Sequence, residues 1–322
     1  MGGKSVRRKN RHGMAPVAAW CAAVAAFFLI SPALGANRWG ADYFPNVSLT
    51  TQDGTVVRFY DDMLKGKAVA VNTMYTSCKD ECPLETARLV QVQRLLGERM
   101  GRDIFFYSIT TDPKNDTPKV LKTYAEKFGV GPGWLFLTGS DEDLKLVVKK
   151  LGLSSARDVA RRDGHSASLM LGNEPTGQWM RNSAVDNPRF LATTIGTFMG
   201  WRDATPAKSY AEARPLMLDR GGYIFETRCV GCHTIGKGDG VGPDLAGVTS
   251  RRARAWLTRY VAEPDRVLAE GDPTATRLLA KYKNVAMPNL GLGKDDVAAV
   301  LSYIEAQGGV SREAAHKNSV SN

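Results

Sequence analysis

The sequence Cys-Val-Gly-Cys-His at positions 229–233 constrains this chain of 322 residues more than any other feature. Paired cysteines in an exported chain usually form structural disulfides. Here a histidine follows the second cysteine directly, which is the attachment motif of a c-type haem: two thiols bond one porphyrin, and the imidazole reaches its iron. We therefore expect haem c bound covalently through Cys229 and Cys232, with His233 as an axial ligand of the iron.

The second axial ligand is expected at Met287. A lone methionine is usually a core residue, but Met287 precedes Pro288 in a Gly-rich stretch that favours a loop over a helix face. Ligation by a methionine and a histidine raises the haem potential towards the range of electron transfer. The pair His233 and Met287 thus predicts an electron-transfer haem.

A second cysteine pair, Cys78 and Cys82, lies between a predicted buried strand at residues 67–75 and a predicted amphipathic helix at residues 84–100. Pro83 fits the first helical turn and disfavours helical geometry at Cys82. Cys82 is thus expected at the helix N-terminus, with its pKa lowered there, and Cys78 in the preceding loop. This arrangement predicts a redox dithiol that opens and closes, not a fixed disulfide.

Outside residues 1–36, one histidine has no role yet. His233 belongs to the haem motif and His316 to the C-terminal tail, which leaves His165. An isolated loop histidine is usually an exposed bystander, but with Cys78 and Cys82 it completes a set of two thiolates and an imidazole. That soft set suits Cu(I), and its nitrogen also accommodates Cu(II). Zn²⁺ is the alternative, although it usually takes a fourth ligand.

Two domains of different class are expected. Strand and helix patterns alternate over residues 43–201, which predicts an α/β domain with helices on the faces of a sheet. Its expected strands are 67–75, 103–110, 134–137, 167–171 and 178–181, and its expected helices are 84–100, 118–128, 141–151 and 188–200. Residues 216–308 predict an all-α domain, with helices at 216–228, 252–261, 273–282 and 295–307. A linker is expected at 202–215 and a disordered tail at 309–322.

Residues 1–36 have the pattern of an export segment. Five Lys or Arg residues precede an apolar run at positions 14–30, in which Cys21 is expected to be a small hydrophobic residue, and small residues follow the run. The run suits either a cleaved signal peptide or an uncleaved membrane anchor. Both place the remaining chain on the periplasmic side of a bacterial inner membrane.

The charge distribution argues against a nucleic-acid partner. The net charge is +10, but half of it comes from the export segment. A nucleic-acid interface needs a clustered basic face, and the densest basic run, Arg251, Arg252 and Arg254, is short. We expect it to be a solvated helix start; docking of an acidic redox partner is the alternative.

Residues 216–308 resemble a small class I cytochrome c. The resemblance is carried by the haem motif, by Gly-Val-Gly-Pro-Asp-Leu at 240–245, by Ala-Met-Pro-Asn-Leu at 286–290, and by a C-terminal helix bearing Tyr303. It implies that the first and last helices of the domain cross and that a cytochrome is the redox partner.

Residues 43–201 resemble the Sco/SenC family of thioredoxin-like copper proteins. The matching motifs are Cys78-x-x-x-Cys82-Pro, Thr-Asp112-Pro and His165-Ser-Ala-Ser. The resemblance implies copper binding by Cys78, Cys82 and His165, and delivery to the subunit of cytochrome c oxidase that carries the binuclear copper centre. It also implies that Asp112 modulates the site, a turn-forming Asp being the alternative. Gly164 and Met170 depart from the family pattern, which usually has an acid and an aromatic residue there.

Together these features predict a copper chaperone with a tethered haem that gives electrons to, or takes them from, the copper and dithiol site. The main alternative is an enzyme, a thiol-disulfide oxidoreductase that uses Cys78 and Cys82 to reduce the cysteines of the oxidase copper site. A third possibility is a redox sensor whose haem reports the state of the dithiol.

Overall fold

A computed structural model describes residues 2–3, 39–78, 81–154, 167–201 and 219–320. The expected export segment at 1–36 apart from residues 2–3, the expected linker at 202–215 and the predicted ligand His165 lie outside these residues. Within the described part of the chain, no helix is both long enough and apolar enough to cross a bilayer.

Residues 39–201 are built on a seven-stranded mixed sheet with the order β2-β1-β5-β4-β3-β6-β7. The strands are β1 (Ser48–Thr51), β2 (Val56–Arg58), β3 (Ala68–Met74), β4 (Phe105–Thr110), β5 (Trp134–Thr138), β6 (Ser168–Asn173) and β7 (Gln178–Ser183). The central strands β3, β4 and β5 are parallel, whereas β6 runs antiparallel to β3. This is the expected thioredoxin-like α/β fold.

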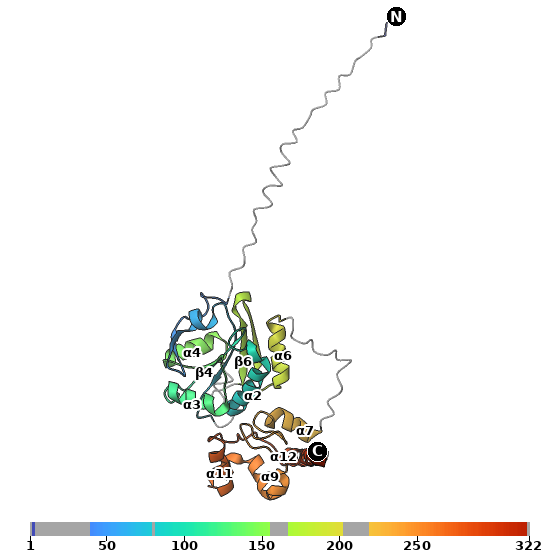
Figure 1. Cartoon of the computed structure of the whole chain (residues 1–322). Coiled ribbons are helices and arrows are strands. Elements are labelled where there is room, and N and C mark those ends of the chain that lie inside the picture. Colours follow the sequence, from blue (N-terminus) through green and yellow to red (C-terminus); the bar gives the residue numbers. More distant parts are fainter. Residues whose placement is uncertain (1, 4–38, 79–80, 155–166, 202–218, 321–322) are drawn as a thin grey trace. The chain divides into compact units, whose positions relative to one another are not determined.

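Alternating side chains of β3 enter two separate cores, one on each face of the sheet. Val69 and Val71 join the core that contains the apolar side chains of α4 (Asp141–Lys150). Ala70 and Met74 join the core formed with the helices α2 (Glu81–Leu96), α3 (Pro118–Phe128) and α6 (Pro188–Phe198). Figure 1 labels β4 and β6 of this sheet together with the helices α2, α3, α4 and α6. A strand with both faces covered is apolar throughout, which explains the continuous apolar run that predicted it.

Two helices begin where side-chain caps and prolines predicted them. The side chain of Thr117 accepts a hydrogen bond from the backbone N–H of Val120 at the start of α3. Asn187 accepts hydrogen bonds from the N–H groups of Arg189 and Phe190 at the start of α6. Each cap satisfies donors that the first helical turn leaves without a partner.

Residues 219–320 form helices and loops, with one isolated β-bridge between Thr234 and Asp244. The helices are α7 (Arg220–Ile224), a π-helical turn (Phe225–Cys229), α8 (Val248–Arg251), α9 (Arg254–Ala262), α10 (Pro264–Ala269), α11 (Pro273–Lys281) and α12 (Lys294–Val320). The sequence did not predict α8 and α10, which are short. Helix α12 continues to Val320, where a disordered tail was expected.

The first and last helices of this part cross at a glycine. A Cβ atom on Gly221 of α7 would lie 2.2 Å from the backbone oxygen of Ala299 in α12. Beside this contact, Ile224 packs in one core with Val300 and Ile304. The absence of a side chain at Gly221 therefore lets the two backbones approach, and the predicted crossing is confirmed.

Candidate dithiol, metal and haem sites

The Cys78 thiol lies in a turn that follows the end of β3. The N–H of Cys78 donates to the carbonyl of Tyr75 at 3.2 Å, which closes this turn. Helix α2 begins at Glu81, so Cys82 is the second residue of the helix. Both thiols are buried, with exposed fractions of 7% for Cys78 and 0% for Cys82.

The two cysteines lie next to each other. The backbone N–H of Cys82 donates to Sγ of Cys78 at 3.4 Å. The N–H groups of a first helical turn stabilise negative charge on an acceptor. The sulfur of Cys78 therefore lies against the N-terminus of α2 and accepts a hydrogen bond from its first turn.

The expectation of a lowered pKa for Cys82 is wrong. The hydrogen bond with Cys78 raises the pKa of Cys82, burial raises it further, and the buried Glu85 adds a smaller effect in the same direction. The cause is that Cys82 is the second residue of α2, not the residue that precedes the helix, since α2 begins before Pro83. There its side chain joins the core instead of facing the open helix end.

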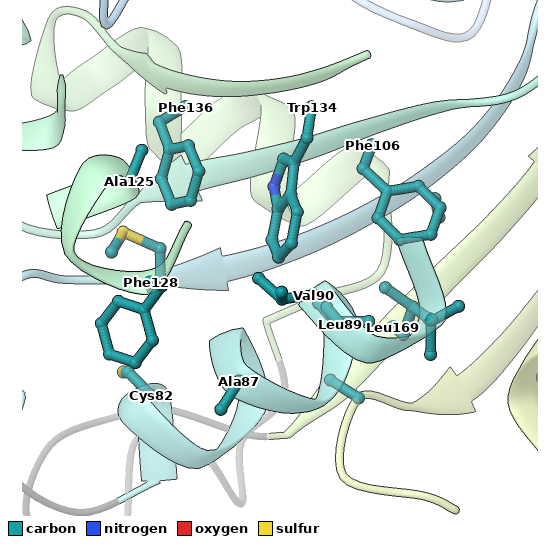
Figure 2. Packing of buried hydrophobic residues seen from close by; sticks show 14 of the residues in the cluster. Cys82, Ala87, Leu89, Val90, Phe106, Ala125, Phe128, Trp134, Phe136 and Leu169 are labelled. Carbon is teal, nitrogen blue, oxygen red and sulfur yellow. The ribbon is translucent and has the colours of Figure 1, made fainter. Parts of the chain in front are cut away.

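Figure 2 shows this environment: Cys82 and Ala87 lie on α2 near Phe128, and the aromatic side chains of β4 and β5 line the same core. The hydroxyl of Thr86 donates to the carbonyl of Cys82 at 2.9 Å, and the same hydroxyl lies 2.9 Å from that of Tyr124. Cys82 is thus fixed by its helix, whereas Cys78 depends on the conformation of its loop.

The third predicted ligand, His165, lies outside the described residues, so the structure does not test it. Among the residues described, no three His, Cys, Asp or Glu side chains are grouped closely enough to hold a metal ion. The sheet register places the strand that follows His165 in the chain: Leu169 of β6 pairs with Asn72 of β3. Because these strands are antiparallel, β6 begins at the edge of the sheet where β3 ends. The chain continues from the end of β3 to Cys78.

The two acids near this edge differ. Asp112 lies in an exposed turn and accepts hydrogen bonds from the side-chain amide of Asn115 at 2.8 and 3.1 Å. Asp116 is completely buried and accepts hydrogen bonds from Thr76 and Thr110. Both acids fall in the turn that the sequence predicted, but only Asp112 was expected to modulate the site, because no pattern separates a buried turn carboxylate from an exposed one.

The haem motif follows the π-helical turn as a compact loop. The N–H groups of Cys232 and His233 both donate to the carbonyl of Cys229, at 3.1 and 3.0 Å. This turn brings the two thiols and the imidazole together. Burial raises the pKa of Cys229 to about 12 and that of Cys232 to about 11.

The imidazole of His233 is oriented as an iron ligand requires. Its Nδ1 lies 2.9 Å from the carbonyl oxygen of Pro243, which can only accept, so Nδ1 carries the proton and Nε2 is left for a metal. Burial lowers the pKa of His233, which keeps the ring neutral. A Cβ atom on Gly242 would lie 2.7 Å from Cε1 of this ring, so the loop packs tightly against it.

The residues around His233 fit a haem. Two cavities open here, and His233, Tyr260 and Met287 line both. Cys232 lines the first cavity and Cys229 the second. The structure thus brings all four predicted haem residues to this space, where Cys229 and Cys232 would bond the haem and His233 and Met287 would be available to its iron.

Comparison with known proteins assigns both parts. The family model described as SCO1/SenC matches residues 36–198, which is about half of the chain, and the model for cytochrome c matches residues 218–307. The chain belongs to the SCO1/SenC family. Its second part is a cytochrome c domain, a class in which haem c is bound covalently.

Curated relatives agree with this assignment. A SCO2-like protein of Rickettsia prowazekii is 35% identical over 144 residues, covering 43% of this chain and 67% of the relative. A putative copper-binding protein of Stutzerimonas stutzeri is 35% identical over 98 residues, covering 30% and 46%. A solved structure of BsSco, described as a member of the Sco family of cytochrome c oxidase assembly proteins with a disulfide switch, is 24% identical, with a TM-score of 0.41 and coverage of 48% and 92%. The chain spans about half to two thirds of the length of its curated relatives.

Proposed function

We propose that this SCO1/SenC protein is an exported copper chaperone that binds its cargo through Cys78, Cys82 and His165. The proposed acceptor is the subunit of cytochrome c oxidase that carries the binuclear copper centre. The observation that carries the proposal is the buried pair of adjacent thiols, in which the N–H of Cys82 donates to the sulfur of Cys78. Two adjacent sulfur ligands and an imidazole suit both oxidation states of copper.

The cytochrome c domain is proposed to serve this site as an electron donor or acceptor. Copper loading requires both thiols, and opening a Cys78–Cys82 disulfide takes up two electrons and two protons. When bound through Cys229, Cys232, His233 and Met287, the haem supplies a one-electron carrier. A carrier on the same chain acts at a high effective concentration. A separate cytochrome is the proposed external redox partner.

The proposed location is the periplasmic side of a bacterial inner membrane. The support is the sequence of residues 1–36, which suits a signal peptide or an anchor. Export also delivers the chain to a compartment in which the cysteines of residues 229–233 can receive haem.

The copper proposal is tested by metal analysis of the purified full-length holoprotein after loading with Cu(I). We expect one iron and one copper per wild-type chain. His165→Ala should keep its iron and bind copper at least about 10-fold more weakly, because an imidazole ligand is lost. His316→Ala, which removes the tail histidine, is the matched control and should bind both metals normally. Unchanged copper affinity in His165→Ala would refute the proposed ligand set.

The alternative function is thiol-disulfide exchange, favoured by the same pair of adjacent thiols. The two functions separate at His165: exchange with a disulfide substrate should survive its replacement, whereas copper binding should not. The electron-transfer role is tested separately by stopped-flow spectra of the haem after copper or a disulfide is added. A haem spectrum that ignores both additions contradicts that role.

A further inference from the structure

We propose that Asp116 is a positioning residue for the dithiol: its buried carboxylate holds the loop that carries Cys78 and thereby sets the approach of Cys78 to Cys82. This inference concerns the same site as the proposed function. Only its copper measurements rest on that function. The dithiol itself is present whatever its partner. The carboxylate reaches the loop through its hydrogen bonds with Thr76.

The contacts of Asp116 converge from two strand ends. The backbone N–H of Thr76 donates to both carboxylate oxygens, at 3.1 and 3.3 Å. The hydroxyl of Thr76 donates to Oδ1 at 2.5 Å, and the hydroxyl of Thr110, the last residue of β4, donates to Oδ2 at 2.5 Å. The carboxylate therefore joins the end of β4 to the residue two positions before Cys78.

Hydrogen bonds, not a cation, stabilise this carboxylate. Asp116 is fully buried, and within the described part of the chain it forms no ion pair with Lys or Arg. A buried carboxylate without its donors is strongly unfavourable. The two threonine hydroxyls and the N–H of Thr76 are thus held where the carboxylate needs them, and the loop conformation is fixed in return.

The loop connects this contact to the sulfur atom. The turn from Tyr75 to Cys78 is closed by the backbone hydrogen bond of 3.2 Å between the N–H of Cys78 and the carbonyl of Tyr75. Cys82 is already fixed by α2 and its core. Asp116 therefore controls the cysteine whose position depends on the loop, and both disulfide closure and chelation of one copper ion need the two sulfurs close together.

The first measurement is the equilibrium of the Cys78/Cys82 pair with glutathione in the full-length holoprotein. In this exchange the dithiol and one glutathione disulfide give the protein disulfide and two glutathione thiols, so two electrons pass to glutathione. Asp116→Asn keeps the shape but loses one acceptor oxygen. We expect it to lower the equilibrium constant for disulfide formation at least about 10-fold, because the loosened loop lowers the effective concentration of Cys78.

Further variants separate positioning from folding. Thr110→Val removes one donor to Asp116 and should give a smaller fall in the same direction, while Thr110→Ser should restore the wild-type value. Thr111→Val is the matched control, since the Thr111 hydroxyl bonds the carbonyl of Met74 and not Asp116.

The inference is overturned if Asp116→Asn or Thr110→Val lowers stability while the glutathione equilibrium stays within about twofold of wild type. Circular dichroism reports whether each variant is folded, and Thr110→Val keeps the test decisive if Asp116→Asn does not fold. Copper affinity, measured in parallel, should fall with the same variants. A wild-type chain that binds no copper would refute the proposed function, yet the glutathione measurement would still decide the role of Asp116.

Discussion

The crossing of α7 and α12 gives a prediction in which two physical effects have opposite signs. Gly221→Ala replaces a helical glycine, and helix propensity alone would stabilise the domain by about 1 kcal/mol. The new Cβ, however, would lie 2.2 Å from the oxygen of Ala299 and 2.7 Å from its carbonyl carbon. Carbon and oxygen atoms in contact are normally about 3.3 Å or more apart. The helices would have to separate by roughly 1 Å.

The steric effect should win, because backbone atoms cannot rotate away as a flexible side chain can. Overpacking of this kind costs about 1–3 kcal/mol, and a backbone clash belongs at the upper end. Subtracting the propensity gain leaves a net loss of about 2 kcal/mol in the free energy of unfolding. For a domain of this size, that corresponds to a fall of about 10 °C in the midpoint of thermal unfolding.

The assay is chemical and thermal unfolding of the holoprotein, followed by the visible absorption of the haem. Gly293→Ala is the matched control, since no heavy atom lies within 4 Å of its Cβ position, and its effect should stay within about 0.5 kcal/mol. A Gly221→Ala variant as stable as wild type, or more stable, would refute the close crossing and leave helix propensity as the only effect.

Two further predictions concern single contacts. Gly242→Ala should displace the ring of His233, since the new Cβ would lie 2.7 Å from Cε1 of that ring. The displacement should weaken the ligation of iron by His233. EPR spectra should then show a higher high-spin fraction, while the covalent haem content stays the same. Tyr60→Phe should cost about 1–2 kcal/mol, because the tyrosine hydroxyl donates to the buried Glu174 at 2.9 Å. Burial and that bond raise the pKa of Tyr60, so the folded state keeps the phenol proton to a higher pH than the unfolded state does. The stability that Tyr60 contributes to the folded state is therefore complete below about pH 10 and is lost as the pH rises further. Denaturation between pH 9 and 12 should therefore show a shallower alkaline decline for Tyr60→Phe than for wild type.

The elements that the sequence predicted well are those whose signals are local. The apolar run of β3, and the caps Thr117 and Asn187 with their following prolines, depend on a few neighbouring residues. The residues of the haem motif are likewise adjacent in the chain, so their chemistry follows from the order of the amino acids alone. Strands β1 and β2 escaped notice because short strands at one side of a sheet lack a long alternating pattern.

Properties that depend on tertiary packing could not be predicted in the same way. The pKa of Cys82 depends on the depth of its helix start and on the Cys78 sulfur beside it, and both follow from the folded core. Asp112 and Asp116 are four positions apart in one turn, yet only Asp116 is enclosed by Thr76 and Thr110. Local sequence favours a turn at both positions and does not say which carboxylate faces inward.

The register of β6 against β3 also bears on when the proposed copper site can exist. Asn72 and Leu169 pair directly although they are roughly 100 residues apart in the chain. Contacts of such high sequence separation form late in folding, because a large loop must close first. A ligand set drawn from both sides of this pairing would assemble only after nearly the whole first domain had folded. A chain still being threaded across a membrane would hold the two thiols without the imidazole, so copper capture would be delayed until folding is complete.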